Sequence, residues 1–183
     1  MKVAVYGGSF DPPHVAHVLA AAYVLSMGDF ARVIVVPVFR HAFEKDLTSF
    51  EHRVRMCELA FAALPVEVSR IEQRLGPPSY TLHTIERLLA DHPSYEPSLV
   101  VGSDVLYESS KWHRFERLIE LAPLFVLGRA GQAHPDAPAA VLPEVCSTEI
   151  RAKLRRRPPL DPGARALVPR AVLEYILQHG LYQ

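Results

Sequence analysis

Short apolar runs alternate with longer segments of helical spacing along this chain of 183 residues. The runs that predict strands cover residues 3–6, 32–37, 65–69, 98–102 and 124–127. The segments with apolar residues every three or four positions, which predict helices, are 14–27, 50–64, 81–91 and 115–121. Because strands that alternate with helices form right-handed βαβ units, the pattern predicts an α/β fold: a parallel sheet of about five strands flanked by helices.

The pattern is less regular after the last of these strands. Residues 130–143 are rich in Pro, Ala and Gly, which predicts a loop that carries one short strand. C-terminal helices follow, separated by the proline-rich segment 158–163. Since no repeat, low-complexity tract or linker divides the sequence, we expect a single domain over residues 1–183. In such a doubly wound, Rossmann-like sheet, the turns after the first, second and fourth strands should meet at one ligand cleft.

The strongest chemical signal lies in residues 1–17. A buried strand leads into the Gly7–Gly8 pair, which lets the backbone turn sharply and lets a ligand approach closely. A Pro-Pro pair at positions 12 and 13 suits the first turn of a helix, where no N–H is needed. His14 and His17 are three residues apart and share one face of that turn. Because a helix N-terminus attracts anions, this order of residues favours a phosphate-binding site.

A metal site built from His14, His17 and Asp11 is an alternative reading of the same segment. Zinc-binding helices space their histidines at i and i+4 with a glutamate between them, which this segment does not have. A purely structural histidine pair is a second alternative. Because strand, glycines, prolines and histidines agree in their order, we favour phosphate binding and expect no metal held by the protein itself.

Residues 147–151, Ser-Thr-Glu-Ile-Arg, carry a second signal. Ser147 or Thr148 can cap a helix whose free N–H groups hold phosphate oxygens. Arg151 lies one helical turn further on and can reach the same anion with its forked guanidinium. Taken alone, the segment is explained equally well as a capped basic helix. Beside the first motif, an anion site is the better explanation.

Five segments together resemble a known family. Residues 7–17, Gly-Gly-Ser-Phe-Asp-Pro-Pro-His-Val-Ala-His, resemble the first signature of the nucleotidylyltransferase superfamily, and residues 147–151 resemble its second. Residues 79–84 and 102–112 resemble the segments that enclose the pyridine nucleotide in nicotinate mononucleotide adenylyltransferases. Residues 167–182 resemble the closing helix of that family, so the resemblance spans essentially the whole chain.

The resemblance implies transfer of the adenylyl group of ATP to nicotinate mononucleotide, which gives deamido-NAD and pyrophosphate in NAD biosynthesis. It implies that His14, His17 and Arg151 are catalytic. The residues that it implies for ATP binding are Gly7, Gly8, Ser9, Phe10, Gly102, Asp104, Ser147 and Thr148. The residues that it implies for mononucleotide binding are Lys45, Arg53, Tyr80, Thr81, Thr84 and Trp112. Mg²⁺ would arrive with ATP, held mostly by phosphate and water oxygens.

Two positions depart from the family pattern. Ala16 stands where the family commonly has Gly and adds one methyl group between the histidines. After the second strand, Phe-Arg-His-Ala-Phe-Glu-Lys over residues 39–45 replaces the usual Pro-Pro-His-Lys or Pro-Pro-His-Arg. We expect Lys45 to take the place of the phosphate-contacting lysine, with Arg40 or His41 assisting. The alternative is that these cations are merely solvated.

Two of the implied mononucleotide residues lie in segments that suggest how each would act. Arg53 lies in a segment that resembles the family's His-Arg-x-x-Met, where it can neutralise a substrate phosphate or pair with a carboxylate of the scaffold. Trp112 is the single tryptophan and lies between Lys111 and His113, which predicts a place near the surface. There an indole can stack on a planar ring.

The composition narrows the choice of partners. Lys and Arg together equal Asp and Glu at 20 each, so no overall field attracts nucleic acid or a membrane. Cys57 and Cys146 are far apart and predict neither a disulfide framework nor a metal site. The first strand leaves no room for a signal peptide, and no apolar stretch reaches membrane-spanning length, so we expect a cytoplasmic protein. A homo-oligomer is left open.

Other functions stay open at this point. Nicotinamide mononucleotide or phosphopantetheine would use the same chemistry with another acceptor. A cytidylyltransferase would leave residues 79–84 and Trp112 unexplained. A regulatory module that binds nucleotide without turnover is the alternative of a different class, and pyrophosphate release distinguishes it from an enzyme.

Overall fold

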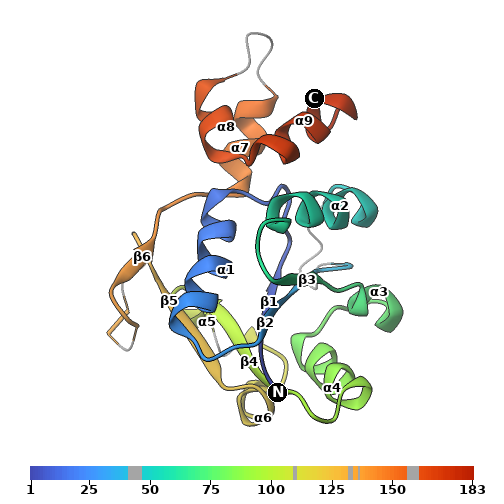
Figure 1. The fold of residues 1–183 in the computed structure, drawn as a ribbon, viewed down its shortest axis with the longest axis vertical. Coiled ribbons are helices and arrows are strands. Elements are labelled where there is room, and N and C mark those ends of the chain that lie inside the picture. Colours follow the sequence, from blue (N-terminus) through green and yellow to red (C-terminus); the bar gives the residue numbers. More distant parts are fainter. Residues whose placement is uncertain (41–46, 109–110, 132–133, 136, 156–160) are drawn as a thin grey trace.

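The computed structural model describes residues 1–40, 47–108, 111–131, 134–135, 137–155 and 161–183. Within them, six parallel strands form a sheet with the order β3-β2-β1-β4-β5-β6 (Figure 1). The strands are β1 (Lys2–Gly8), β2 (Arg32–Pro37), β3 (Val66–Val68), β4 (Glu96–Gly102), β5 (Leu124–Arg129) and β6 (Ala140–Leu142). The helices are α1 (Val15–Met27), α2 (Phe50–Phe61), α3 (Ile71–Leu75), α4 (Thr81–Asp91), α5 (Val105–Glu108), α6 (Phe115–Leu121), α7 (Ser147–Leu154), α8 (Pro162–Leu167) and α9 (Arg170–Gln178).

The parallel sheet confirms the predicted fold class, with one strand more than expected. The additional strand is β6, which pairs with β5 through Gly128 with Ala140 and Arg129 with Leu142. It lies in the segment for which the sequence predicts a loop with one short strand. This strand has only three residues and lies in a short apolar run between two prolines, so its own signal is weak. Its pairing with β5 is what makes it a strand.

Helices cover both faces of the sheet because alternate residues of a strand point to opposite sides. Val3 and Val5 of β1 pack with buried residues of α3, α4 and α6. Ala4, between them, packs with buried residues of α1 and α2, among them Ala20 and Cys57. The sheet is therefore doubly wound, as predicted.

A third apolar cluster joins the C-terminal helices to the rest of the molecule. Ile150 of α7 and Ile176 of α9 are buried together with Ala16 of α1 and Met56 of α2. Figure 1 shows α7, α8 and α9 above the ends of α1 and α2. This cluster brings the second sequence signal close to the first.

The proline-rich segment 158–163 lies between two C-terminal helices, as predicted, but its last two residues belong to the second of them, α8. Pro162 is the first residue of α8, and the side chain of Asp161 caps that helix by accepting a hydrogen bond from the N–H of Gly163 at 2.8 Å. A proline at the first helical position loses no hydrogen bond, which explains why it opens a helix here.

The order of the strands places the site. β1 lies between β2 and β4, so successive strands are added on one side of β1 and then on the other. In open parallel sheets, ligands bind at this switch point, beyond the carboxyl ends of the strands. The turns after β1, β2 and β4 lie at that edge.

Candidate active site

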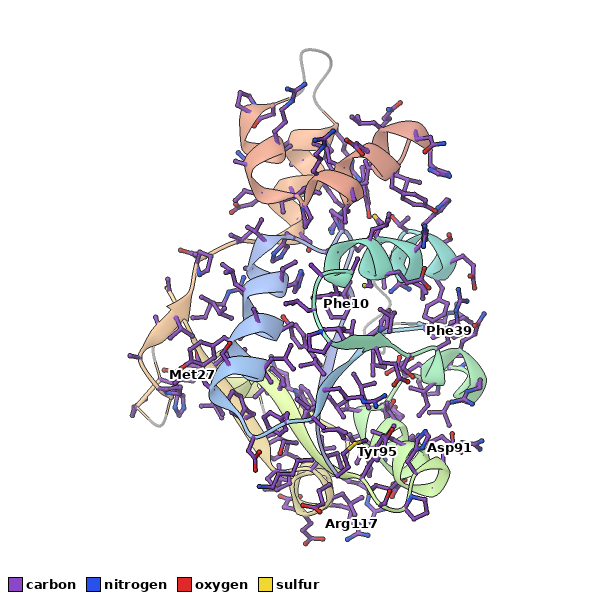
Figure 2. All side chains as sticks on the ribbon, in the orientation of Figure 1. Phe10, Met27, Phe39, Asp91, Tyr95 and Arg117 are labelled. Atoms are coloured by element: carbon purple, nitrogen blue, oxygen red, sulfur yellow. The ribbon has the colours of Figure 1, made fainter. Side chains whose placement is uncertain are left out.

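The turn after β1 folds around a buried aromatic ring. Phe10 has a positive φ of 48° and is buried, and its ring lies 4.9 Å from the ring of His17. A Cβ at Gly8 would lie 3.1 Å from the same ring, which explains the glycine there. Figure 2 shows Phe10 in the interior, next to α1 and α2. The side chain of Phe10 therefore supports the turn from beneath, and only its backbone is free to line an ATP site.

Asp11 joins three distant parts of the chain to this turn. Its carboxylate is buried and accepts hydrogen bonds from the N–H of Thr48 at 3.1 Å and from the hydroxyl of Tyr182 at 2.5 Å. Its carbonyl oxygen accepts a hydrogen bond from Nη1 of Arg151 at 2.7 Å. Asp11 and Tyr182 thus connect the first turn to the C-terminal end of the chain.

Replacing Tyr182 with Phe should destabilise the protein. The change leaves one oxygen of the buried Asp11 carboxylate without its hydroxyl partner, which costs about 1–3 kcal/mol of unfolding free energy. Urea denaturation measures this loss, with Tyr95→Phe, on the far side of the sheet, as the matched control. Equal unfolding free energies for the two variants would contradict the role given to the Tyr182 hydroxyl.

The two motif histidines form a stacked pair at the start of α1. Their ring centroids are 3.7 Å apart, and Nδ1 of His17 accepts a hydrogen bond from the backbone N–H of His14 at 3.1 Å. His17 therefore carries its proton on Nε2. Nδ1 of His14 is buried and has no hydrogen-bond partner among the described residues. One imidazole thus has a fixed donor, and the other has a buried nitrogen that a ligand can satisfy.

Both imidazoles are neutral at pH 7. Burial, followed by the nearby charge of Arg129, lowers the pKa of His14 to about 4. The pKa of His17 is well below its usual range. The main cause is desolvation by the surrounding protein, and the charges of His14 and Arg129 lower it further. A neutral imidazole keeps one donor nitrogen and one acceptor nitrogen, so the pair can bind by hydrogen bonds without carrying charge.

The helix begins later than the sequence predicts. His14 is the N-cap and Val15 the first residue of α1, so the two prolines precede the helix instead of forming its first turn. Asp11 and Pro12 are joined by a cis peptide bond, a geometry that the sequence pattern does not reveal.

The low histidine pKa values predict an acid-sensitive fold. Below pH 6.5 the unfolded chain binds protons at these histidines, whereas folded His14 does so only near pH 4. The unfolding free energy should therefore fall by up to about 1.4 kcal/mol per pH unit for each histidine as the pH drops through this window. Denaturation at pH 7 and pH 5 without nucleotide should show a smaller loss in a His14→Gln, His17→Gln variant. Equal losses in this variant and in an exposed His92→Gln control would contradict the assignment.

Arg129 is a member of this site that the sequence analysis missed. It is the last residue of β5, its charge lowers the pKa of both motif histidines, and its Nη2 donates to the carbonyl oxygen of Val145 at 2.6 Å. The sequence feature that could have identified Arg129 is its position two residues after the predicted strand 124–127, at the sheet edge where ligands bind. Arg129 adds a positive charge to an otherwise neutral histidine pair.

The second sequence signal is fastened to the first. The hydroxyl of Ser147 donates to the carbonyl oxygen of Pro12 at 3.0 Å. Arg151 donates Nη1 to the carbonyl oxygen of Asp11 and Nη2 to Oγ1 of Thr148 at 3.2 Å. The expected capping role is wrong: Cys146 is the N-cap of α7 and makes no side-chain cap bond, while Ser147 binds the turn after β1.

The turn after β4 lies close to the same region. The carboxylate of Asp104 lies against Gly102, and a side chain at position 102 would displace this carboxylate. The buried hydroxyl of Ser103 accepts a hydrogen bond from the backbone N–H of Arg129 at 3.3 Å. This bond ties the ends of β4 and β5 together.

The residues expected around the mononucleotide fall into two groups. Tyr80 stacks on His113 with ring centroids 4.6 Å apart, so the start of α4 lies beside the Trp112 segment. Trp112 is half-buried and lies edge-to-face with the ring of Phe115, with ring centroids 6.4 Å apart. Thr81 opens α4 and is half-buried. The stacking of Tyr80 on His113 therefore places the start of α4 next to the residue that follows Trp112.

Thr84 and Arg53 are placed differently. Thr84 is buried, and its hydroxyl donates to Oε1 of Glu72 at 3.2 Å. Arg53 is 1% exposed and donates to the carbonyl oxygens of Thr48, Ser9 and Phe39 at 2.8, 2.9 and 3.4 Å. Both side chains are held inside the scaffold. For Arg53 this favours the alternative of a role within the scaffold, and for Thr84 it favours a structural role over a contact with the mononucleotide. Lys45, like His41, lies outside the described residues.

Across the described ranges, no group of three or more His, Cys, Asp or Glu side chains is arranged to hold a metal ion. Among the same residues, no helix is long and apolar enough to cross a membrane.

Comparisons with known proteins show the family of this chain. Residues 5–153 match the family model described as cytidylyltransferase-like. The chain is 46% identical to a protein of Anaeromyxobacter dehalogenans named "Probable nicotinate-nucleotide adenylyltransferase", with 100% of the chain and 97% of the relative covered. A protein of the same name from Myxococcus xanthus is 41% identical, with 100% and 95% covered.

The fold is also found in solved structures. The nicotinic acid mononucleotide adenylyltransferase of Plasmodium falciparum, complexed with NaAD, aligns with a TM-score of 0.85 at 20% identity, covering 99% of this chain and 97% of that one. A putative nicotinate-nucleotide adenylyltransferase of Vibrio parahaemolyticus aligns with a TM-score of 0.71 at 22% identity, covering 99% and 94%.

Proposed function

We propose that this chain, which belongs to the nicotinate-nucleotide adenylyltransferase family of cytidylyltransferase-like proteins, transfers the adenylyl group of ATP to nicotinate mononucleotide. The observation that carries the proposal is the junction of the two signature segments. Ser147 and Arg151 bind the backbone of Pro12 and Asp11, beside the stacked histidines and Arg129. This arrangement gathers two guanidinium groups and two imidazoles where a triphosphate can bind.

The proposed reaction is an in-line substitution at the α-phosphorus of ATP. A 5′-phosphate oxygen of the mononucleotide forms a bond to that phosphorus, and the bond from it to the bridging oxygen of pyrophosphate breaks. The acceptor is already an anion, so no general base and no enzyme nucleophile is needed. Positioning and stabilisation of the developing charge then supply most of the acceleration.

The residues at the junction have distinct parts in this proposal. His17 donates from Nε2 to an oxygen on the α-phosphate, because its Nδ1 is held by the N–H of His14. His14 offers a buried nitrogen with no partner among the described residues, which a polar ligand atom would satisfy. Arg151 and Arg129 neutralise the charge on the leaving phosphates.

The turns around the junction complete the proposed ATP site. Gly7, Gly8 and Ser9 leave room for the triphosphate, Ser147 and Thr148 place the N-terminus of α7 beside it, and Gly102 with Asp104 meets the adenosine. The carboxylate of Asp11 is engaged by Thr48 and Tyr182 and so does not offer a metal cage. We therefore assign Mg²⁺ to the phosphate and water oxygens of the substrate, where it would neutralise the leaving pyrophosphate.

The acceptor is assigned to the surface formed by Tyr80, Thr81 and Trp112. Its aromatic rings can stack on a pyridine ring, and the first N–H groups of α4 can receive a carboxylate. A carboxylate is the group by which nicotinate differs from nicotinamide.

Pyrophosphate release from Mg-ATP tests the proposal. Nicotinate mononucleotide, nicotinamide mononucleotide and phosphopantetheine are compared as acceptors, and nicotinate mononucleotide should give the highest kcat/KM. A preference for either other acceptor would overturn the assignment of the acceptor surface. Binding of ATP without turnover with any acceptor would favour a regulatory module instead.

A further inference from the structure

A buried carboxylate beside the proposed site takes no part in the chemistry described above. Glu72 of α3 is 5% exposed. Its Oε2 accepts a hydrogen bond from the backbone N–H of Phe39 at 2.9 Å, and its Oε1 accepts one from the hydroxyl of Thr84 at 3.2 Å. Glu72 thus joins the chain after β2 to the first turn of α4, which carries the proposed acceptor surface.

The peptide at Phe39 is also held by a buried cation. Nη2 of Arg53 donates to the carbonyl oxygen of Phe39, while Nη1 donates to that of Ser9 in the turn after β1. The negative charge of Glu72 acts to raise the pKa of Arg53, although burial lowers it overall, so the two groups lie within electrostatic reach. A continuous path therefore leads from Thr84 through Glu72, Phe39 and Arg53 to Ser9.

The residues on either side of Phe39 are fixed by the same two segments. The N–H of Val38 donates to the carbonyl oxygen of Gly8 at 2.9 Å, and the N–H of Arg40 donates to Oγ of Ser79 at 3.3 Å. Figure 2 shows Phe39 between α2 and α3, where these elements meet. Residues 38–40 therefore connect the phosphate turn to the residue before Tyr80.

We propose that Glu72 is a positioning residue that sets the acceptor surface at the correct distance from the phosphate turn. The inference rests on the proposed function and deepens it on the acceptor side. A buried carboxylate that binds a backbone N–H makes a strong, directional bond, and its loss leaves that N–H unsatisfied. The contacts of Arg129, Ser147 and Arg151 do not pass through Glu72. The bonds that reach the phosphate turn, from Arg53 to Ser9 and from Val38 to Gly8, do not use the Glu72 carboxylate, so the effect falls on the acceptor and spares ATP.

Steady-state kinetics of Glu72→Ala and Glu72→Gln test the proposal with both substrates varied. Glu72→Ala should raise KM for nicotinate mononucleotide about tenfold and change KM for ATP less than about twofold. Glu72→Gln should recover most of the loss, because its amide oxygen still accepts from Phe39 and its NH₂ group can donate to Thr84. Glu67→Ala in β3, which removes an exposed carboxylate paired with Arg32, is the matched control and should match the wild type.

A merely structural role gives a different result. Partial unfolding would lower kcat through the fraction of active protein and leave both KM values unchanged. That pattern, or an equal rise in both KM values, would overturn the proposal.

A readout that needs no turnover separates this proposal from the proposed function. Hydrogen exchange at the Phe39 amide should be faster in Glu72→Ala than in Glu67→Ala, even if nicotinate mononucleotide is not the acceptor. Unchanged exchange at Phe39 would overturn the positioning role, whatever the acceptor assay shows.

Discussion

His17→Ala should lower kcat by about a hundred- to a thousandfold while the fold survives. The reason is the fixed tautomer of this imidazole. Nδ1 accepts the N–H of His14, so Nε2 carries the proton, and burial keeps the ring neutral at pH 7. A preorganised donor that faces the charge developing on the α-phosphate costs little reorganisation in the transition state, and alanine removes it entirely.

Single-turnover measurements of AMP transfer check this expectation, with circular dichroism to verify the fold. His92→Ala is the matched control, because this exposed histidine follows α4 at the opposite end of the sheet. We expect the control to retain the wild-type rate. Near-wild-type turnover in His17→Ala would contradict the role assigned to its Nε2.

Trp112→Ala should raise KM for the mononucleotide by about ten- to a hundredfold, which is the range that stacking on one ring supplies. KM for ATP should stay close to its wild-type value, because the ATP contacts come from other elements. Trp112 is half-buried and packs on Phe115, so the variant also loses some stability. Trp112→Phe keeps an aromatic face and should recover part of the affinity.

Isothermal titration calorimetry with the mononucleotide and with ATP separately measures the Kd of each variant for each substrate, and these Kd values should change in the same way as KM. The comparison of Ala with Phe at position 112 distinguishes lost stacking from general destabilisation, which would weaken both ligands together. A selective loss of ATP binding in Trp112→Ala would contradict the assignment of this residue to the acceptor surface.

Most of the helices and strands follow from local sequence patterns. The structure differs from the prediction where contacts between distant residues determine the conformation. The runs at 32–37 and 81–91 have the bounds of β2 and α4, because their apolar spacing is strong and turns flank them. β6 gives only a weak signal of its own and exists through pairing with β5. Pro162 opens a helix because Asp161 caps it, a local signal that the proline-rich composition obscured.

The sequence predicts a site residue well where the residue belongs to a recognised motif. It predicts less well where the role depends on whether the folded protein buries the side chain. The motifs name Tyr80 and Trp112 for the acceptor, and in the structure Tyr80 stacks on His113, the residue after Trp112. Neither Arg53 nor Thr84 could be assigned to the interior from the sequence, because each has a residue type common in phosphate and sugar sites. Their hydrogen bonds to Phe39 and Glu72, formed across separate elements, decide their placement.

The fate of the α-phosphorus tests the central claim most directly. ATP labelled at that phosphorus is incubated with nicotinate mononucleotide and the purified chain, and the products are separated. If the chain transfers the adenylyl group, the label appears in deamido-NAD, and one unlabelled pyrophosphate is released for each dinucleotide formed. Label that stays in ATP while the nucleotide binds, or that appears as free AMP, would contradict adenylyl transfer by this protein.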